Sequence, residues 1–273
     1  MTRLFSFLVL ALPFFFSSES KSGKYAYPAQ EFSAHRNDTT TFDDHIGEST
    51  FTYNGQQYDA IVVAPSASEI SLHWLSKDQT AYKSIQALKD VLQEKKKDIL
   101  MITNGGMFMK NNVPVGLFIS QGKELRPVDT DTDQPGNFYM QPNGVFYLDH
   151  TGAHVTNTSD YIKKSGKHGK VVHATQSGPM LISKGTINAK FNPASVNRNL
   201  RSGVGILPNG NVVFIISKEA QTTFFDFASI FKERFGCKDA LYLDGAISKM
   251  YLKSSRPNEL NGDFGAIIAV TAR

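Results

Sequence analysis

Two short apolar segments of the sequence each end in a polar side chain that a glycine follows. Ala240–Leu243 leads to Asp244, and Ile99–Thr103 leads to Asn104. This pattern is typical of strands that carry a polar group to the rim of a sheet, where the glycine lets a ligand approach the backbone. A carboxylate in such a place can serve as a nucleophile or a general base. The sequence therefore predicts a reactive pocket around Asp244 and Asn104, although either dipeptide alone is also a common turn.

The elements that position these residues are predicted to be many short strands and two main helices. Apolar side chains on one face predict helices over Thr80–Lys96 and Thr223–Phe235. Many strands with so few helices favour the α+β class, as a single mixed domain with hairpins. Besides the two segments above, the predicted strands are Tyr58–Val63, Glu69–Trp74, Gly116–Gln121, Gly144–Asp149, His154–Thr156, Pro179–Ser183, Gly203–Leu207, Asn211–Ile216 and Ala266–Val270.

The beginning of the chain differs from the rest. Arg3, the apolar Leu4–Phe16 and the small residues that follow predict a signal peptide over residues 1–20, so we expect a periplasmic or secreted protein. The apolar stretch is short for a membrane span, which needs roughly 20 residues. Stable membrane insertion is therefore not expected, and an uncleaved anchor is the alternative. Residues 21–50 are polar and predict a leader or arm before a domain over residues 51–273.

The composition limits the kinds of ligand. The formal net charge of +4 is mild and does not require a nucleic-acid partner. Cys237 is the only cysteine, so it forms neither an intrachain disulfide nor a cysteine metal cage, and it is predicted to be a buried hydrophobe. No cofactor or metal is predicted. A divalent cation at Asp129–Asp133 is the open alternative, because its alternating carboxylates resemble a calcium loop that lacks the usual glycine and glutamate.

Several glycine-containing motifs follow one another along the chain. In order, they are Asn104–Phe108, Pro114–Leu117, Gly136–Met140, Pro142–Phe146, Ala174–Leu181, Asn199–Gly205 and Leu241–Ser248. As an ordered set, they resemble the phosphodiester glycosidase superfamily and, within it, a branch of exported bacterial proteins. The superfamily includes the uncovering enzymes, which hydrolyse N-acetylglucosamine from a sugar-1-phosphodiester. The resemblance extends from about Tyr58 to the C-terminus.

This resemblance implies an exported hydrolase that cleaves a glycosidic bond to phosphate in a sugar-phosphate substrate or glycopolymer. It implies catalytic roles for Asp244, Asn104 and Arg201. The chain departs from the family at Asp244–Ser248, where relatives tend to have Asp-Gly-Gly-Gly-Ser, and at Arg201–Gly205, where they tend to have Arg-Thr-Ala-Val-Gly. The bulkier residues after Asp244 favour the alternative, a non-catalytic glycan-binding or envelope-organising module on the same fold.

A site that binds a phosphodiester needs a cation and hydrogen-bond donors. Its two free oxygens fit the fork of an arginine, and Arg201 stands at the start of a predicted strand, with Arg198 as its rival. The backbone N–H groups that follow Asn104 and Asp244 are predicted to bind the remaining oxygen in glycine turns. Gly105 and Gly106 are included in this binding surface.

Glycosyl transfer to water commonly uses two carboxylates, although phosphate leaves readily and demands less of the acid. Asp244 is the predicted nucleophile or base, because among the carboxylates it combines a motif position with an adjacent glycine. For its partner, the sequence leaves Glu124, Asp129 and Asp263 open. The predicted hydrogen-bond partners of the sugar are Gln176, Ser177 and Ser248, although Ser177 also fits a simple turn.

Overall fold

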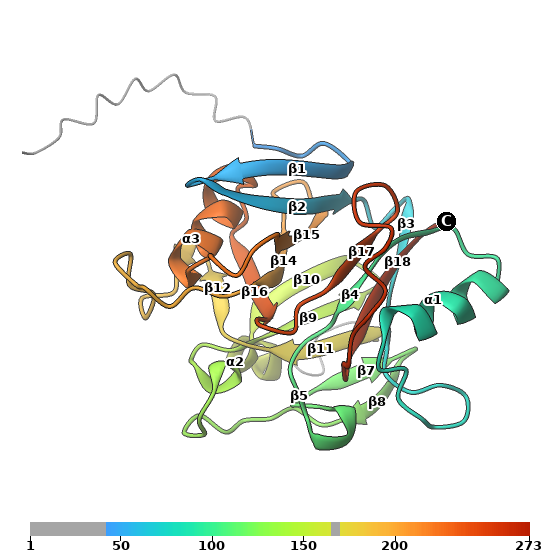
Figure 1. The fold of residues 1–273 in the computed structure, drawn as a ribbon. Coiled ribbons are helices and arrows are strands. Elements are labelled where there is room, and N and C mark those ends of the chain that lie inside the picture. Colours follow the sequence, from blue (N-terminus) through green and yellow to red (C-terminus); the bar gives the residue numbers. More distant parts are fainter. Residues whose placement is uncertain (1–41, 165–169) are drawn as a thin grey trace, which may run out of the picture. The chain divides into compact units, whose positions relative to one another are not determined.

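The computed structural model describes residues 42–164 and 170–273, and these residues belong to one compact unit. The predicted signal peptide and residues 21–41 of the predicted arm lie outside the described residues. The first strand begins at Gly47, so regular structure starts before the boundary at Phe51 that the sequence predicts. Strands dominate, helices are few, and the chain has the mixed α+β class that the sequence predicts (Figure 1).

The largest sheet has seven strands in the order β1-β2-β15-β14-β16-β12-β13, and all neighbours are antiparallel. Its strands are β1 (Gly47–Tyr53), β2 (Gln56–Val63), β12 (Met180–Ser183), β13 (Thr186–Ile187), β14 (Ser202–Ile206), β15 (Val212–Ser217) and β16 (Asp239–Asp244).

Two further sheets have five and four strands. The five-stranded sheet has the order β10-β9-β11-β7-β8, from β7 (Phe118–Ser120), β8 (Lys123–Arg126), β9 (Gly144–Asp149), β10 (Gly152–Asn157) and β11 (His173–Ser177). The four-stranded sheet has the order β17-β4-β18-β3, from β3 (Ser68–His73), β4 (Ile99–Asn104), β17 (Met250–Leu252) and β18 (Ile267–Ala272). A separate pair joins β5 (Phe108–Met109) and β6 (Val113–Pro114).

Side chains cap the helices at their first turns. Ser84 caps α1 (Ile85–Glu94), Asn157 caps α2 (Thr158–Lys163), and Thr223 caps α3 (Phe224–Ser229), each by accepting a backbone N–H of the first turn. The last of these helices continues as a π-helical turn over Ile230–Arg234. Short 3₁₀ turns cover Lys110–Asn112 and Asn137–Tyr139.

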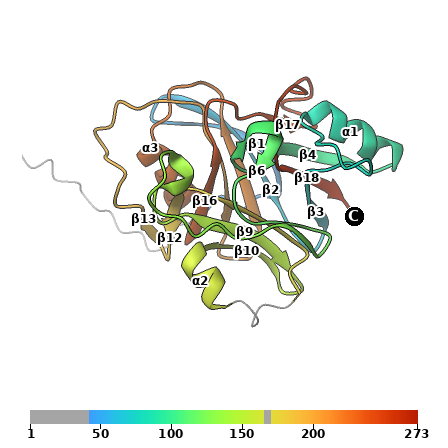
Figure 2. The same ribbon diagram turned by 90° about the horizontal axis from the view of Figure 1, so that it is seen from below.

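The three sheets share one central apolar core, and a helix packs against the outer face of each. Alternating side chains explain this arrangement, because successive residues of a strand point to opposite faces. In β16, Leu241 lies in the central core, whereas Tyr242 lies in the outer layer with α3. In the same way, α1 covers the four-stranded sheet and α2 covers β9 and β10 of the five-stranded sheet (Figures 1 and 2). The ends of strands from all three sheets therefore meet at the borders of the same core.

The structure differs from the predicted elements at two informative places. The helix predicted over Thr80–Lys96 begins at Ile85, because Lys83 has a left-handed φ of 64° and Ser84 then caps the first turn. The sequence did not predict β11, whose residues include His, Thr, Gln and Ser and show no apolar pattern. All five residues of β11 are nevertheless buried, so its polar groups must find partners inside the protein.

No helix in the described part of the chain is long and apolar enough to cross a membrane. Cys237 is a free, buried cysteine, and burial raises the pKa of its thiol well above the usual range. Its side chain packs in the outer core beneath α3, as expected for a small hydrophobe.

Candidate active site

Strands from all three sheets end at one place, and the polar residues of their ends are joined by hydrogen bonds. Asn104 ends β4, Ser177 ends β11, and Asp244 ends β16, while Ser202 begins β14 opposite Asp244. The Asn104 amide donates to Ser202 Oγ at 3.0 Å, and Ser177 Oγ donates to the Leu243 carbonyl at 3.1 Å. These contacts bring Asn104, Ser177 and Asp244 into one cluster.

A buried network fixes the turn that follows Asp244. Ser202 Oγ and Ser248 Oγ lie 2.9 Å apart, and the N–H of Ser248 donates to the Gly245 carbonyl at 2.7 Å. Asn104 Oδ1 also accepts the N–H of Lys249 at 3.2 Å. The side chains of Asn104, Ser202 and Ser248 are buried, so their hydrogen bonds are made within the protein. Asn104 and Ser248 thus hold the Asp244 turn against β4.

Asp244 is a partly buried carboxylate with little compensation for its charge. Burial raises its pKa to about 6, and the Gly245 N–H, which donates to Asp244 Oδ1 at 2.6 Å, opposes this effect. Among the described residues, no cation forms an ion pair with it. A carboxylate whose pKa is raised in this way is more basic than an ordinary aspartate and titrates near neutrality, as catalytic acids and bases commonly do.

Tyr242 lies between Asp244 and Arg201. A methyl group added to Gly245 would collide with the Tyr242 hydroxyl, which places this hydroxyl at the Asp244 turn. Burial raises the pKa of Tyr242, the Arg201 guanidinium lowers it, and the Asp244 charge raises it again. Arg201 and Asp244 therefore both act on the Tyr242 hydroxyl, which lies near each of them.

Arg201 is enclosed by the protein, with 1% of the residue exposed. Its Nε donates to the Thr222 carbonyl at 2.7 Å and its Nη2 to the Asn197 carbonyl at 3.2 Å. The guanidinium lies 3.7 Å from the centre of the Phe224 ring, and burial lowers its pKa while Tyr242 opposes this. Arg201 therefore ties two loops to the start of β14, and its guanidinium is not open to solvent.

The glycines after Asn104 allow β4 to approach its neighbours closely. A Cβ at Gly105 would lie 3.1 Å from Ala266, and a Cβ at Gly106, which has a φ of 142°, would lie 3.2 Å from Thr175 Oγ1. The N–H of Gly105 donates to the Ala266 carbonyl at 2.7 Å. This N–H and that of Gly245, both predicted to bind a phosphate oxygen, are thus already used inside the protein.

Gln176 is buried and its amide is fully engaged. Its Oε1 accepts the N–H groups of Leu117 and Asp129 at 3.0 and 2.9 Å. Its Nε2 donates to the Asp129 carbonyl at 2.7 Å and to Thr158 Oγ1 at 3.3 Å. Gln176 therefore fixes two chain segments beside β11, whereas the sequence predicts that it meets the sugar.

The three carboxylates considered as a second acid lie in other surroundings. Glu124 is an exposed residue of β8. Asp129 accepts a backbone N–H at 2.8 Å, and Asp263 accepts the Asn112 amide at 2.7 Å. None of these three carboxylates is among the groups that shift the pKa of Asp244. Within the described segments, no group of three or more His, Cys, Asp or Glu residues is placed to hold a metal ion.

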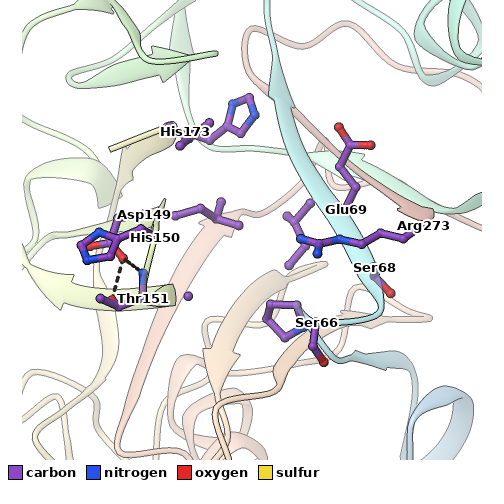
Figure 3. Close-up of a pocket in the computed structure, with 13 residues that line it drawn as sticks. Ser66, Ser68, Glu69, Asp149, His150, Thr151, His173 and Arg273 are labelled. Carbon is purple, nitrogen blue, oxygen red and sulfur yellow. Dashed lines mark hydrogen bonds between the residues drawn. The ribbon is translucent and has the colours of Figure 1, made fainter. Parts of the chain in front are cut away.

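A cavity of about 490 Å³ lies at the opposite ends of the strands (Figure 3). It is bordered by the start of β3 at Ser68, the end of β9 at Asp149 and the start of β11 at His173. Figure 3 shows Arg273 pointing into it, and Asp149 bonded to Thr151. None of the site residues predicted from the sequence lines this cavity.

Comparison with known protein families shows which family this chain belongs to. The family model described as phosphodiester glycosidase matches residues 97–269, which is more than half of the chain. This chain belongs to the phosphodiester glycosidase family. All the clustered strand ends, from Asn104 to Asp244, lie within the matched residues.

Individual relatives agree with this placement. The Escherichia coli (strain K12) protein named uncharacterized protein YigE is 33% identical over 194 residues, which are 71% of this chain and 74% of that protein. The catalytic domain of zebrafish N-acetylglucosamine-1-phosphodiester alpha-N-acetylglucosaminidase, auto-inhibited by its pro-peptide, has a TM-score of 0.57 at 15% identity, over 88% of this chain and 86% of that one. A hypothetical protein from Synechocystis has a TM-score of 0.51 at 15% identity, over 83% and 61%. These solved structures share the fold of this family member.

Two residues of the candidate site, Ser202 and Tyr242, are not predicted by the sequence analysis. Ser202 directly follows Arg201, and neighbouring side chains along a strand point to opposite faces. This alternation is the signal in the sequence that could have indicated Ser202 as the partner of Asn104. Tyr242 precedes Asp244 by two residues in an apolar run, a pattern typical of a core aromatic residue. The ring of Tyr242 does pack in the outer core.

Proposed function

We propose that this chain hydrolyses the glycosidic bond to phosphate in a sugar-1-phosphodiester, with Asp244 as nucleophile or general base. The observation that carries this proposal is the environment of Asp244, a partly buried carboxylate at the junction of three sheets whose pKa is raised to about 6. Membership of the phosphodiester glycosidase family supports the class of reaction.

Two routes use the same ionised group. As a nucleophile, the Asp244 carboxylate bonds to the anomeric carbon while the bond from that carbon to the phosphate oxygen breaks, and water then hydrolyses the glycosyl ester. As a base, Asp244 takes a proton from a water molecule whose oxygen attacks the anomeric carbon directly. In both routes the phosphate leaves with the electron pair. Because phosphate is a good leaving group, neither route depends on a strong second acid.

The phosphate clamp is assigned to Arg201 in this proposal, because Arg201 acts on Tyr242, whose hydroxyl lies at the turn that follows Asp244. Direct contact with phosphate requires the segment at Asn197 to release the Arg201 guanidinium. Arg198 needs no such change, since it is exposed and donates to one main-chain carbonyl at 3.0 Å. Lysine substitution at each position separates the two assignments.

The substrate class and location follow from the family and the N-terminal sequence. The zebrafish relative is named for a reaction on an N-acetylglucosamine-1-phosphodiester, and we propose a sugar-1-phosphodiester or a glycopolymer that contains one for this chain. The predicted signal peptide supports action in the periplasm or outside the cell. Asn104 and Ser248 hold the catalytic turn, and Ser177 joins it to β11.

The test is hydrolysis of a panel of sugar-1-phosphodiesters by the mature protein, with released sugar as the readout. We expect at least one member to be hydrolysed, and we expect the Asp244→Asn variant to be inactive on it. Binding of sugars without hydrolysis of any member would contradict the proposal and favour a non-catalytic glycan-binding module.

A further inference from the structure

A groove of about 470 Å³ lies beside the end of β3. Three lysines and three aromatic rings contribute to its lining, and no aspartate or glutamate does. We call it the lysine groove and define it by His73, Trp74, Lys77, Tyr82, Lys95 and Lys123. It contains none of the residues of the Asp244 cluster.

Three exposed lysines bring positive charge to the lining of this groove. Lys77, Lys95 and Lys123 are exposed, and none forms an ion pair with a carboxylate in the part of the chain that the structure describes. The neighbouring Lys97 differs, since it is paired with Glu69 at 2.5 Å. Unpaired cations around a concave surface attract anionic ligands, and the attraction is sensitive to salt.

The aromatic rings give the groove a surface that suits sugars. Trp74 is partly buried and lies edge-on to Phe118, with 6.0 Å between ring centres, while Tyr82 lies edge-on to His73 at 6.2 Å. These contacts hold the rings in fixed orientations. The faces of such rings carry negative charge density that attracts the polarised C–H groups of a pyranose. In addition, the buried Nε1–H of Trp74 has no hydrogen-bond partner among the described residues.

The groove starts at the same level along the strands of the four-stranded sheet as the catalytic cluster. His73 of β3 and Asn104 of β4 both pair with Ile267 of β18, one from each side. Neighbouring strands lie about 4.8 Å apart, so the backbones of His73 and Asn104 are separated by roughly 10 Å. A chain of sugars bound in the groove is therefore near enough to present a further unit to Asp244.

We propose that the lysine groove binds the chain of a phosphodiester-linked sugar polymer that flanks the bond to be cleaved. This proposal rests on the proposed function and specifies the substrate as a polymer. The lysines meet the phosphodiester charges, and Trp74 and Tyr82 meet the sugar rings. Burial, His173 and Lys95 together lower the pKa of His73 to about 4, so His73 is neutral at physiological pH and adds no charge of its own.

The test compares two triple variants of the full mature protein. The groove variant carries Lys77→Ala, Lys95→Ala and Lys123→Ala. The control variant carries Lys163→Ala, Lys190→Ala and Lys232→Ala, which remove the same charge from exposed lysines outside the groove. Binding of a fluorescent oligomer of phosphodiester-linked glucose is measured by anisotropy at low and high salt. We expect the groove variant to bind on the order of tenfold more weakly at low salt, and the control variant to bind like the wild type.

A second arm separates this proposal from the proposed function. Hydrolysis of a small sugar-1-phosphodiester should be the same in the groove variant and the wild type, while kcat/KM for the oligomer should fall. If no substrate is hydrolysed, the proposed function fails, and the anisotropy difference still tests the groove. Equal oligomer binding by the groove variant and the wild type would overturn the groove proposal. Equally tight wild-type binding of polygalacturonate or a single-stranded oligonucleotide would overturn the choice of a phosphodiester-linked glycan.

Discussion

Asp149 and Asp244 occupy similar local positions at opposite ends of the strands. Each ends a strand and is followed by a turn, yet their carboxylates differ in hydrogen bonding. Asp149 accepts the Thr151 N–H at 2.8 Å, the Thr151 hydroxyl at 2.6 Å and His154 Nε2 at 3.2 Å. Burial alone would raise its pKa, but these partners outweigh burial and lower it. Asp244 has the Gly245 N–H alone among the described partners, and its pKa is raised.

If Asp244 is the reactive carboxylate, as we propose, the volume of a cavity is a poor guide to the reactive end of this fold. The cavity of about 490 Å³ borders Asp149, whose charge is already stabilised by its partners (Figure 3). Asp244 lies in a tighter, mostly buried cluster, where its charge is poorly compensated. A carboxylate that keeps its basicity is better suited to attack carbon or to take a proton from water.

The largest expected effect is on catalysis. Asp244→Asn keeps the shape of the side chain but removes the charge, so we expect kcat to fall by about a hundredfold or more while substrate binding changes little. Asp149→Asn is the matched control at the other end of the strands and should retain activity close to that of the wild type. Steady-state kinetics on a substrate from the panel measures both. Similar losses in the two variants would remove the distinction between the two acids.

The next effect concerns the two arginines considered as the phosphate clamp. Arg201→Lys cannot reproduce two carbonyl hydrogen bonds and the contact with Phe224, so we expect the free energy of unfolding to fall by about 2 kcal/mol and the activity to fall as well. Arg198→Lys should leave stability unchanged, because Arg198 is exposed. Urea denaturation and kinetics are measured for both variants. If Arg198→Lys alone raises KM, the phosphate clamp belongs to Arg198.

The third effect concerns the pH dependence of stability, with opposite signs for the two acids. The pKa of Asp244 rises from 3.8 to about 6 on folding, so its contribution to stability is greatest below pH 3.8 and is lost as the pH rises to about 6. That change corresponds to roughly 3 kcal/mol. At pH 8, Asp244→Asn should therefore stabilise the protein, by about 2 kcal/mol.

Asp149 should behave in the reverse way. Folding lowers its pKa, so its contribution is present above its ordinary pKa and is lost as the pH falls through the lowered value. Asp149→Asn should therefore destabilise the protein at pH 8, by about 1 kcal/mol. Urea denaturation at pH 8 and pH 4 checks both variants. Destabilisation by Asp244→Asn at pH 8 would show that the Asp244 charge is compensated after all.

Much of the fold could be predicted from the sequence, because apolar patterning marks most of its strands and α3. β16 and β4 are examples, since their apolar residues stop at Asp244 and Asn104. β11 could not be predicted in this way. Its burial depends on hydrogen bonds between Gln176 and residues far away in the sequence, which no local pattern shows.

The candidate site was predictable in part for the same reason. Motifs and strand-terminal patterns in the sequence predict Asn104, Ser177 and Asp244 as site residues, and the structure places these three strand ends together. The enclosure of Arg201 and the engagement of Gln176 depend on loops that fold over them from elsewhere in the chain. Residue type and spacing indicate what a side chain can do, whereas the surrounding loops decide whether it is open to a ligand.

The most direct test of the role of Asp244 is the pH dependence of kcat/KM between pH 4 and pH 8, for the wild type and for Asp149→Asn. Both routes require ionised Asp244, so kcat/KM should be constant above its pKa and should fall tenfold per pH unit below about 6. The same profile is expected for Asp149→Asn. A profile that stays flat from pH 8 to pH 4, or a break that moves when Asp149 is changed, would contradict the assignment of the reactive carboxylate to Asp244.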